Sequence, residues 1–259
     1  MTLHRDSDAI LSVRGLSKTF HARAKRPIAA IADVSLEVAR GEFLGIVGPS
    51  GGGKTTLLKT VAGLLPPTSG EVVVGGRVVD GPIDDFGIAF QQPVLLPWRT
   101  ALDNVLLPIE MLGLTPAKYR DEAHRLLELV GLGGFEDRRP RELSGGMQQR
   151  VALCRALIHD PAILLMDEPF GALDEFTREA LNDHLLTLWE QSHKTVLFVT
   201  HSVAEAVYLC DRVAVLTPRP ARLVDVVPIE LPRPRQADIR YEPEFASHVR
   251  AIQEKLRAR

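Results

Sequence analysis

The 259-residue chain has few aromatic residues, few cysteines and no strong excess of charge of either sign. Aromatic residues make up 5% of the sequence and the net charge is −2, so we expect no nucleic-acid partner: neither a basic surface nor a platform for base stacking is indicated. The two cysteines, Cys154 and Cys210, lack metal-ligand spacing and are expected to be packed, reduced thiols.

Long apolar runs are also missing. No uninterrupted apolar segment approaches the length that a membrane-spanning helix needs. The first residues, Met1–Asp8, are polar and include acids, which is not the pattern of a signal peptide. If the protein works at a membrane, we expect other chains to hold it there.

Apolar segments that are present predict an α/β fold. Buried parallel strands are expected where short apolar runs recur, with helical segments between them, and the sheet should be mostly parallel. Period-two alternation near the start predicts half-buried strands. A different pattern, rich in helix signals, covers residues 92–154, so we expect a helical subdomain there, inserted in a core of residues 1–91 and 155–259. The expected strands are 10–13, 34–38, 43–47, 71–74, 78–79, 87–90, 163–166, 195–199, 213–216 and 222–227.

A glycine-rich segment after the strand at 43–47 matches the P-loop pattern, with a helix pattern behind it. Glycines allow backbone N–H groups to turn toward phosphates, and the helix adds the positive end of its dipole. Lys54 should reach the β- and γ-phosphates, the Thr55 hydroxyl should bind Mg²⁺, and Thr56 should assist through its N–H. The other candidate phosphate-binding residues of this loop are Gly48, Ser50, Gly51 and Gly53. A chance glycine-rich turn is the competing interpretation, and the flanking strand and helix argue against it.

Two carboxylates, Asp167 and Glu168, end the apolar strand at 163–166. Ligands of open α/β sheets bind at this end of the strands. We predict that Asp167 holds Mg²⁺, through water, and that Glu168 is the general base for the water that attacks the γ-phosphate. Acids are common at strand ends, so this prediction depends on the P-loop upstream.

The segment Leu143–Gln149, Leu-Ser-Gly-Gly-Met-Gln-Gln, lies between these two motifs. Ser144 is a preferred helix N-cap, and Gly145 and Gly146 would let the backbone approach an anion closely. A helix start without a ligand is the competing interpretation, since Ser-Gly-Gly alone is a weak signal.

Together these motifs resemble the ATP-binding subunits of ABC transporters. The P-loop resembles the family's Gly-Pro-Ser-Gly-x-Gly-Lys-Ser/Thr-Thr, with Gly52 at the variable position, and Leu143–Gln149 resembles the family signature. The resemblance covers nearly the whole chain and implies a RecA-like P-loop NTPase core, an antiparallel β-subdomain and the inserted helical subdomain. It also implies that Ser144, Gly145 and Gly146 act on ATP bound by a second copy, in a two-fold dimer.

Four further positions match the family by their order in the chain. Gln91, rather than its neighbour Gln92, corresponds to the Q-loop glutamine, a ligand of Mg²⁺ and water. Asp174 corresponds to the D-loop, and His201 to the switch histidine that contacts the γ-phosphate and steadies Glu168. Phe20 resembles the aromatic residue that stacks on adenine, although a lone phenylalanine more often belongs to a core.

The resemblance implies an ATPase that powers a membrane transporter, with ATP and Mg²⁺ as ligands. The expected partners are a second copy, two permease subunits that dock near residues 93–104 and, indirectly, a periplasmic solute-binding protein. The expected location is the cytoplasmic face of the inner membrane. Residues 91–98, 216–221 and 230–235 resemble the nitrate, sulfonate and taurine importer subgroup, which is an analogy about the solute.

Two alternatives remain open on the sequence. One is a soluble ABC ATPase of repair, translation or cluster assembly, which would usually carry a long coiled-coil insertion or two tandem ATPase halves. The other is a nucleotide sensor that does not hydrolyse ATP. This alternative is disfavoured because the residues expected for hydrolysis are all present: Lys54, Asp167, Glu168 and His201.

Overall fold

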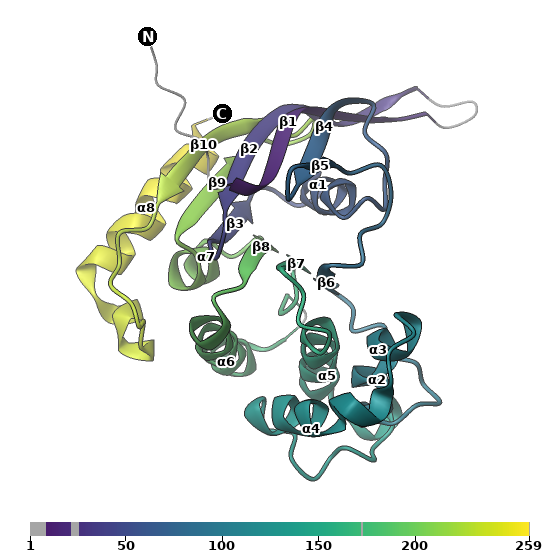
Figure 1. Cartoon of the computed structure of the whole chain (residues 1–259). Coiled ribbons are helices and arrows are strands. Elements are labelled where there is room, and N and C mark those ends of the chain that lie inside the picture. Colours follow the sequence, from purple (N-terminus) through teal and green to yellow (C-terminus); the bar gives the residue numbers. More distant parts are fainter. Residues whose placement is uncertain (1–8, 22–25, 172, 259) are drawn as a thin grey trace. The chain divides into compact units, whose positions relative to one another are not determined.

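The computed structural model describes residues 9–21, 26–171 and 173–258, and these form two compact units (Figure 1). One unit lies within Met1–Ile83 and His193–Arg259, and the other is Asp84–Ser192. The predicted limits of the helical subdomain, 92 and 154, fall inside the second unit, and those limits stay a prediction. The described residues include no helix that is long and apolar enough to span a membrane.

The first unit contains an antiparallel sheet in the order β2-β1-β4-β5. Its long strands β1 and β2 pair along most of their length, and buried residues alternate with exposed ones in the second half of β2. The bounds are β1 Ala9–Phe20, β2 Ile28–Ala39, β4 Ser69–Val74 and β5 Arg77–Val78. The predicted strands at 10–13 and 34–38 are therefore confirmed, and both are longer than predicted.

The same unit also contains the ordered strands β10-β9-β3-β8. Strand β3 is parallel to both β8 and β9, whereas β10 is antiparallel to β9. All residues of β3 and β8 are buried, as expected of central parallel strands. The bounds are β3 Phe43–Val47, β8 Thr195–Thr200, β9 Arg212–Leu216 and β10 Leu223–Pro228.

Two helices of the first unit begin at predicted site segments. Helix α1 begins at Lys54, within the P-loop, and α7 begins two residues after His201. Helix α8 lies along β9, β10 and α7 at the end of the chain (yellow in Figure 1). The bounds are α1 Lys54–Val61, α7 Val203–Leu209, the 3-10 helix η3 Ala237–Tyr241 and α8 Pro243–Arg257.

The second unit combines a parallel strand pair, β6 and β7, with a group of helices (teal and green in Figure 1). Its helices pack on the long helix α5, which begins at the signature segment. The bounds are β6 Phe86–Ala89, α2 Ala101–Val105, α3 Leu107–Met111, η1 Pro116–Tyr119, α4 Arg120–Leu129, η2 Pro140–Glu142, α5 Gly145–Leu157, β7 Ile163–Asp167 and α6 Glu175–Ser192. The fold is the P-loop NTPase fold that the sequence predicted.

Candidate nucleotide site

The predicted site residues are divided between the two units. The P-loop and His201 lie in the first unit, whereas Gln91, the signature, the acidic strand end and Asp174 lie in the second.

In the first unit, Lys54 occupies the centre of the P-loop. Its ammonium donates to the carbonyl oxygens of Gly48 at 2.9 Å and of Pro49 at 3.2 Å, and the side chain is buried. The neighbouring Ser50, Gly51 and Thr55 are exposed, and Thr56 is half-buried. The loop therefore wraps around a single buried cation while its outer residues face the solvent.

The loop also excludes larger residues at its inner turn. Gly53 has φ 97°, and a Cβ at this position would lie 2.6 Å from the carbonyl oxygen of Ala30. Only glycine combines this conformation with so close an approach of two backbone segments. A cradle of this kind, with a lysine at its centre and a helix N-terminus behind it, fits a polyphosphate.

His201 lies at the same end of the sheet as the P-loop. Strands β3 and β8 are parallel neighbours in which Val47 pairs with Thr200, so Gly48 and His201 each follow a member of the same register pair. The structure thus brings these two predicted site residues to one sheet edge, where ligands of α/β sheets bind.

A short polar network holds the turn that carries His201. The Thr200 hydroxyl donates to the carboxylate of Glu205 and accepts from the backbone N–H of Ser202 at 3.0 Å. The Ser202 hydroxyl in turn accepts from the N–H of Glu205 at 3.3 Å, which caps α7. The sequence analysis did not identify Glu205 as a positioning residue; its place three residues after a serine N-cap was the available signal.

In the second unit, Gln91 and Glu168 lie in equivalent positions just after two neighbouring strands. Strands β6 and β7 are parallel, and Ala89 pairs with Met166, so both site residues come two positions after this register pair. Asp167 is buried as the last residue of β7, and Gln91 is exposed.

Glu168 has a strained backbone. Its φ of 46° is in the left-handed region, which few residues other than glycine adopt. Such strain persists where surrounding contacts hold it, and it concentrates at functional sites. Here the chain after Glu168 is held by Arg178 of α6, whose guanidinium donates to the carbonyl oxygens of Phe170 at 3.3 Å and Leu173 at 2.7 Å. Sequence analysis missed Arg178, because nothing in the local sequence connects it to the acidic motif.

The signature begins α5 as predicted. The Ser144 hydroxyl accepts from the N–H of Met147 at 3.2 Å and is exposed, and Gly145 beside it is exposed as well. Gly146 is buried, and a Cβ there would lie 3.0 Å from Cγ2 of Thr177. The glycine therefore permits close packing of α5 on α6, while the residues before it face outward.

Asp174 caps α6. Its carboxylate accepts from the backbone N–H of Thr177 at 3.0 Å and from the Thr177 hydroxyl at 2.7 Å. These two bonds hold the pKa of Asp174 below its usual value, so the carboxylate is charged at neutral pH. Ala172, the first residue of the predicted D-loop, lies outside the described residues.

Further contacts join α5 to the segment on either side of Gln91. The Gln149 amide donates to the carbonyl oxygen of Phe90 at 3.0 Å. The guanidinium of Arg155 donates to the carbonyl oxygens of Pro93 at 2.7 Å and Val94 at 2.8 Å. The partners of Gln149 and Arg155 could not be predicted from local sequence, because both contacts join residues about sixty positions apart.

Phe20 ends β1 with 39% of its surface exposed, and the ammonium of Lys18 lies 5.3 Å from its ring centroid. The exposed ring is compatible with stacking on a base, which stays a prediction. Among the described residues, no group of three His, Cys, Asp or Glu side chains gathers to hold a metal ion. The predicted set of Thr55, Gln91 and Asp167 contains only one such residue, so this finding does not test it.

Comparisons with known proteins agree with this geometry. Residues 31–171 match the family model described as ABC transporter. An uncharacterized ABC transporter ATP-binding protein of Methanocaldococcus jannaschii is 52% identical over 87% of this chain and 84% of its own length. A taurine import ATP-binding protein of Ruegeria pomeroyi is 45% identical over 82% of this chain and 80% of its own length. A solved dimeric post-hydrolysis ATP-binding cassette with ADP and Pi has a TM-score of 0.76 and 33% identity, covering 85% of this chain and 99% of that one.

Proposed function

This chain belongs to the family of ABC transporter ATP-binding proteins, and from that premise we propose how its residues use ATP and which solute is moved. The chain is an ATPase subunit that powers import through a membrane transporter, and its site binds ATP. The importer subunits among its relatives do not support the soluble alternative.

The P-loop holds the triphosphate. Lys54 contacts the β- and γ-phosphates, and the backbone around Gly51 and Gly53 surrounds them. The support is the cradle itself, in which a side chain at Gly53 would collide with Ala30. Phe20 stacks on the adenine, which would leave base selectivity loose because stacking reads no hydrogen-bonding pattern.

Thr55, Asp167 and Gln91 would hold Mg²⁺, which when bound neutralises charge on the phosphates. The donor set fits, because hydroxyl, carboxylate and amide oxygens are the ligands that Mg²⁺ prefers. Glu168 accepts the proton of the attacking water, and His201 contacts the γ-phosphate and orients Glu168. The strained backbone of Glu168 supports this role, because it fixes the direction in which the carboxylate leaves the strand end.

The signature works on the partner's ATP. Ser144 and Gly145 are exposed at the N-terminus of α5, where backbone N–H groups and the helix dipole favour an anion. Phe176, two residues after Asp174, is 86% exposed, and contact with a second copy would cover its ring. ATP therefore joins two copies, and loss of the γ-phosphate releases them.

The permease subunits dock on the segment near residues 93–104. This segment exposes Val94 at 62% and Trp98 at 68%, and exposed aromatic and aliphatic residues of this kind favour a protein partner. Arg155 of the signature helix holds the start of the segment through two backbone carbonyls. A shift of α5 on signature binding would thus be transmitted to the docked permease.

The solute is a small sulfonate such as taurine, supported by the taurine import relative. The ATPase does not touch the solute, so a periplasmic binding protein would select it, and this subunit would lie at the cytoplasmic face of the inner membrane. Nitrate remains a weaker candidate, because only the subgroup resemblance favours it.

The observation that carries the proposal is the pairing of parallel strand ends that lead into the site residues. Gln91 and Glu168 each come two positions after one register pair, Ala89 and Met166. Gly48 and His201 each come one position after another pair, Val47 and Thr200. The experiment is purification of the tagged chain from membranes of its own host in mild detergent. Multi-span permease subunits that co-purify, and taurine uptake that is lost in a Glu168→Gln strain, are the expected results. A chain that co-purifies with no membrane protein would contradict the transport role.

A further inference from the structure

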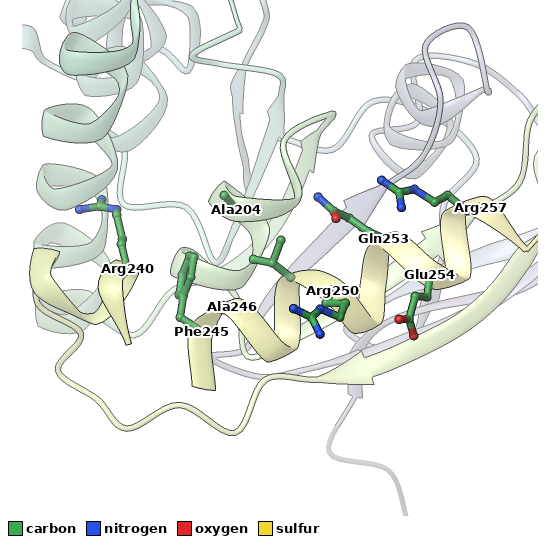
Figure 2. A pocket seen from close by; sticks show the side chains of 9 residues that line it. Ala204, Arg240, Phe245, Ala246, Arg250, Gln253, Glu254 and Arg257 are labelled. Carbon is green, nitrogen blue, oxygen red and sulfur yellow. The ribbon is translucent and has the colours of Figure 1, made fainter. Parts of the chain in front are cut away.

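A groove outside the nucleotide site lies between α7 and the C-terminal segment formed by η3 and α8. Its volume is about 550 Å³, within the range typical of small-molecule sites. All of its lining residues belong to the first unit, and Figure 2 shows eight of them by name. The lining residues are Ala204, Arg240, Phe245, Ala246, Val249, Arg250, Gln253, Glu254 and Arg257.

The helix that forms one wall is firmly held. Phe245 and Ile252 on the inner face of α8 are buried, and the Lys255 ammonium lies 2.6 Å from the carboxylate of Asp225 on β10. At the other end, the guanidinium of Arg240 stacks 3.6 Å from the ring centroid of Tyr208 on α7. These contacts fix both walls, so the groove is a property of the packed unit rather than of a loose tail.

The groove presents cations along one side. Arg250 and Arg257 are two helical turns apart on α8, roughly 10 Å along the axis, and they share a face with Gln253. Arg240 also lines the groove, with its guanidinium stacked on Tyr208, whereas Glu254 is the one carboxylate in the lining. No salt bridge found among the described residues involves Arg250 or Arg257.

The floor of the groove is apolar. Phe245 is only 6% exposed, and Ala246, Val249 and Ala204 of α7 surround it. A solvated face of an amphipathic helix would explain scattered arginines, but it would not explain a concave surface with a buried aromatic floor between them.

We propose that this groove binds an amphiphilic organic anion, with its acidic group on the arginines and its apolar body over Phe245. Guanidinium groups are the side chains best suited to phosphate, sulfonate or carboxylate. An apolar body would remove the floor of the groove from water, which stabilises the complex in proportion to the area covered.

The groove also touches the element that carries the switch histidine. Ala204 lies in the first turn of α7, the turn capped by Ser202 and connected through Glu205 to Thr200. A ligand that packs on Ala204 therefore contacts the support of His201. Its occupancy should change the ATPase rate without competing with ATP.

The test is calorimetric titration of the purified full chain with alkyl phosphates of four to eight carbons, below their micelle concentrations. We expect saturable binding that tightens about fourfold for each added methylene and weakens as salt is raised. Exchange of both groove arginines, Arg250→Gln with Arg257→Gln, should weaken binding at least tenfold, as should Ala246→Trp, which fills the groove. The matched control is Arg77→Gln on the exposed strand β5, which should bind as the wild type does.

Three results would overturn the proposal. The first is the absence of saturable binding below millimolar concentration. The second is equal affinity of the wild type and the double variant for the alkyl phosphate. The third is inorganic phosphate binding as tightly as the octyl compound. Sedimentation with phosphatidylglycerol vesicles then distinguishes the sources of the anion. If the wild type sediments with the vesicles and the double variant does not, the anion is a lipid headgroup. If only the free alkyl compound binds, the anion is a soluble metabolite. ATP turnover is measured separately, so failure here is distinguishable from failure of the ATPase assignment.

Discussion

At the scale of the single residue, Glu168 combines a proposed chemical role with a backbone conformation that few side chains adopt. The sequence predicted the carboxylate from its place after an apolar strand, but φ of 46° becomes visible only in the structure. The contacts of Arg178 with the following loop explain how this conformation is held.

We predict that Glu168→Gln retains ATP binding and loses turnover by a factor of about 10² to 10⁴, the usual contribution of a general base. The amide keeps the shape of the side chain but cannot take up a proton. Phosphate release and gel filtration with ATP are the measurements, and an ATP-dependent dimer should accumulate. The control Glu128→Gln, on the exposed side of α4, should hydrolyse ATP normally. A fully active Glu168→Gln would show that the base is another group.

The thiols offer a second test at this scale. Cys154 and Cys210 are completely buried, and burial raises the pKa of both thiols. A raised pKa keeps each thiol protonated and unreactive as the pH rises toward 8.5, where ordinary cysteines ionise. We predict no labelling by a thiol reagent in the native protein at pH 8, and labelling of both cysteines in denaturant. Rapid labelling of the native chain would contradict this packing.

At the scale of the element, α5 carries the signature at one end and Arg155 near the other. The two carbonyl oxygens that Arg155 holds belong to Pro93 and Val94, at the start of the proposed docking segment. Val94 has φ 43°, a conformation that a β-branched residue rarely adopts, and the fork of Arg155 explains how it persists.

We predict that Arg155→Met leaves basal ATPase activity of the isolated subunit within about twofold, because Arg155 does not touch the nucleotide. It should reduce permease-stimulated ATPase activity and solute uptake at least tenfold, since one charge-assisted hydrogen bond contributes about 1.5–3 kcal/mol. Arg155→Lys should recover part of the loss. Arg141→Met, an exposed arginine of η2, is the control. Normal stimulation in Arg155→Met would remove Arg155 from the coupling route.

The C-terminal end of α7 is capped by Arg235, which the sequence marked only as part of the segment 230–235. The buried guanidinium of Arg235 donates to the carbonyl oxygens of Val207, Tyr208 and Cys210 at 2.9–3.0 Å. These groups belong to the last turn of the helix, where carbonyls lack helical partners.

We predict that Arg235→Met lowers the free energy of unfolding by about 3 kcal/mol, because three carbonyls lose a charged donor inside the protein. Urea unfolding measures the change, with Arg77→Met on β5 as a control that should stay within about 0.5 kcal/mol. A change of that small size in Arg235→Met would mean that water replaces the guanidinium.

Elements differed in how well the sequence predicted them. Strand β3 was predicted with its observed bounds, because a continuous apolar run before a glycine-rich loop has few alternatives. Within the predicted helical region 92–154, the segment before α4 is the 3-10 helix η1, and the side chain of Thr115 in front of it makes no capping bond. Local composition predicts a helix start, but the type of its first turn depends on packing that the sequence does not state.

Residues of the candidate site also differ in whether local sequence could predict them. Lys54, Thr55, Asp167 and Glu168 could be predicted because phosphate chemistry demands particular residues at particular spacings, and Ser144 could be predicted from the family resemblance. By contrast, Arg178 holds the loop after Glu168 and Glu205 holds the turn that carries His201, and both are ordinary side chains whose partners are set by tertiary folding. No local pattern marks such a residue.

At the scale of the whole molecule, the account requires two copies of the chain. In the proposed mechanism, the loop around Lys54 of one copy and the outward-facing Ser144 of the other form one site, and each would remain half a site in a lone subunit. Cooperative dependence of hydrolysis on protein concentration follows from this arrangement.

The most direct test mixes two inactive variants, Lys54→Ala and Ser144→Arg. Each alone should fail to hydrolyse ATP. In the mixed dimer, the intact P-loop of the Ser144→Arg subunit meets the intact signature of the Lys54→Ala subunit, which forms one complete site. An equal mixture should therefore recover up to about a quarter of wild-type ATPase activity, since half of the dimers are mixed and each has one site of two. A mixture that stays inactive, although mixed dimers form, would contradict a site shared between two copies.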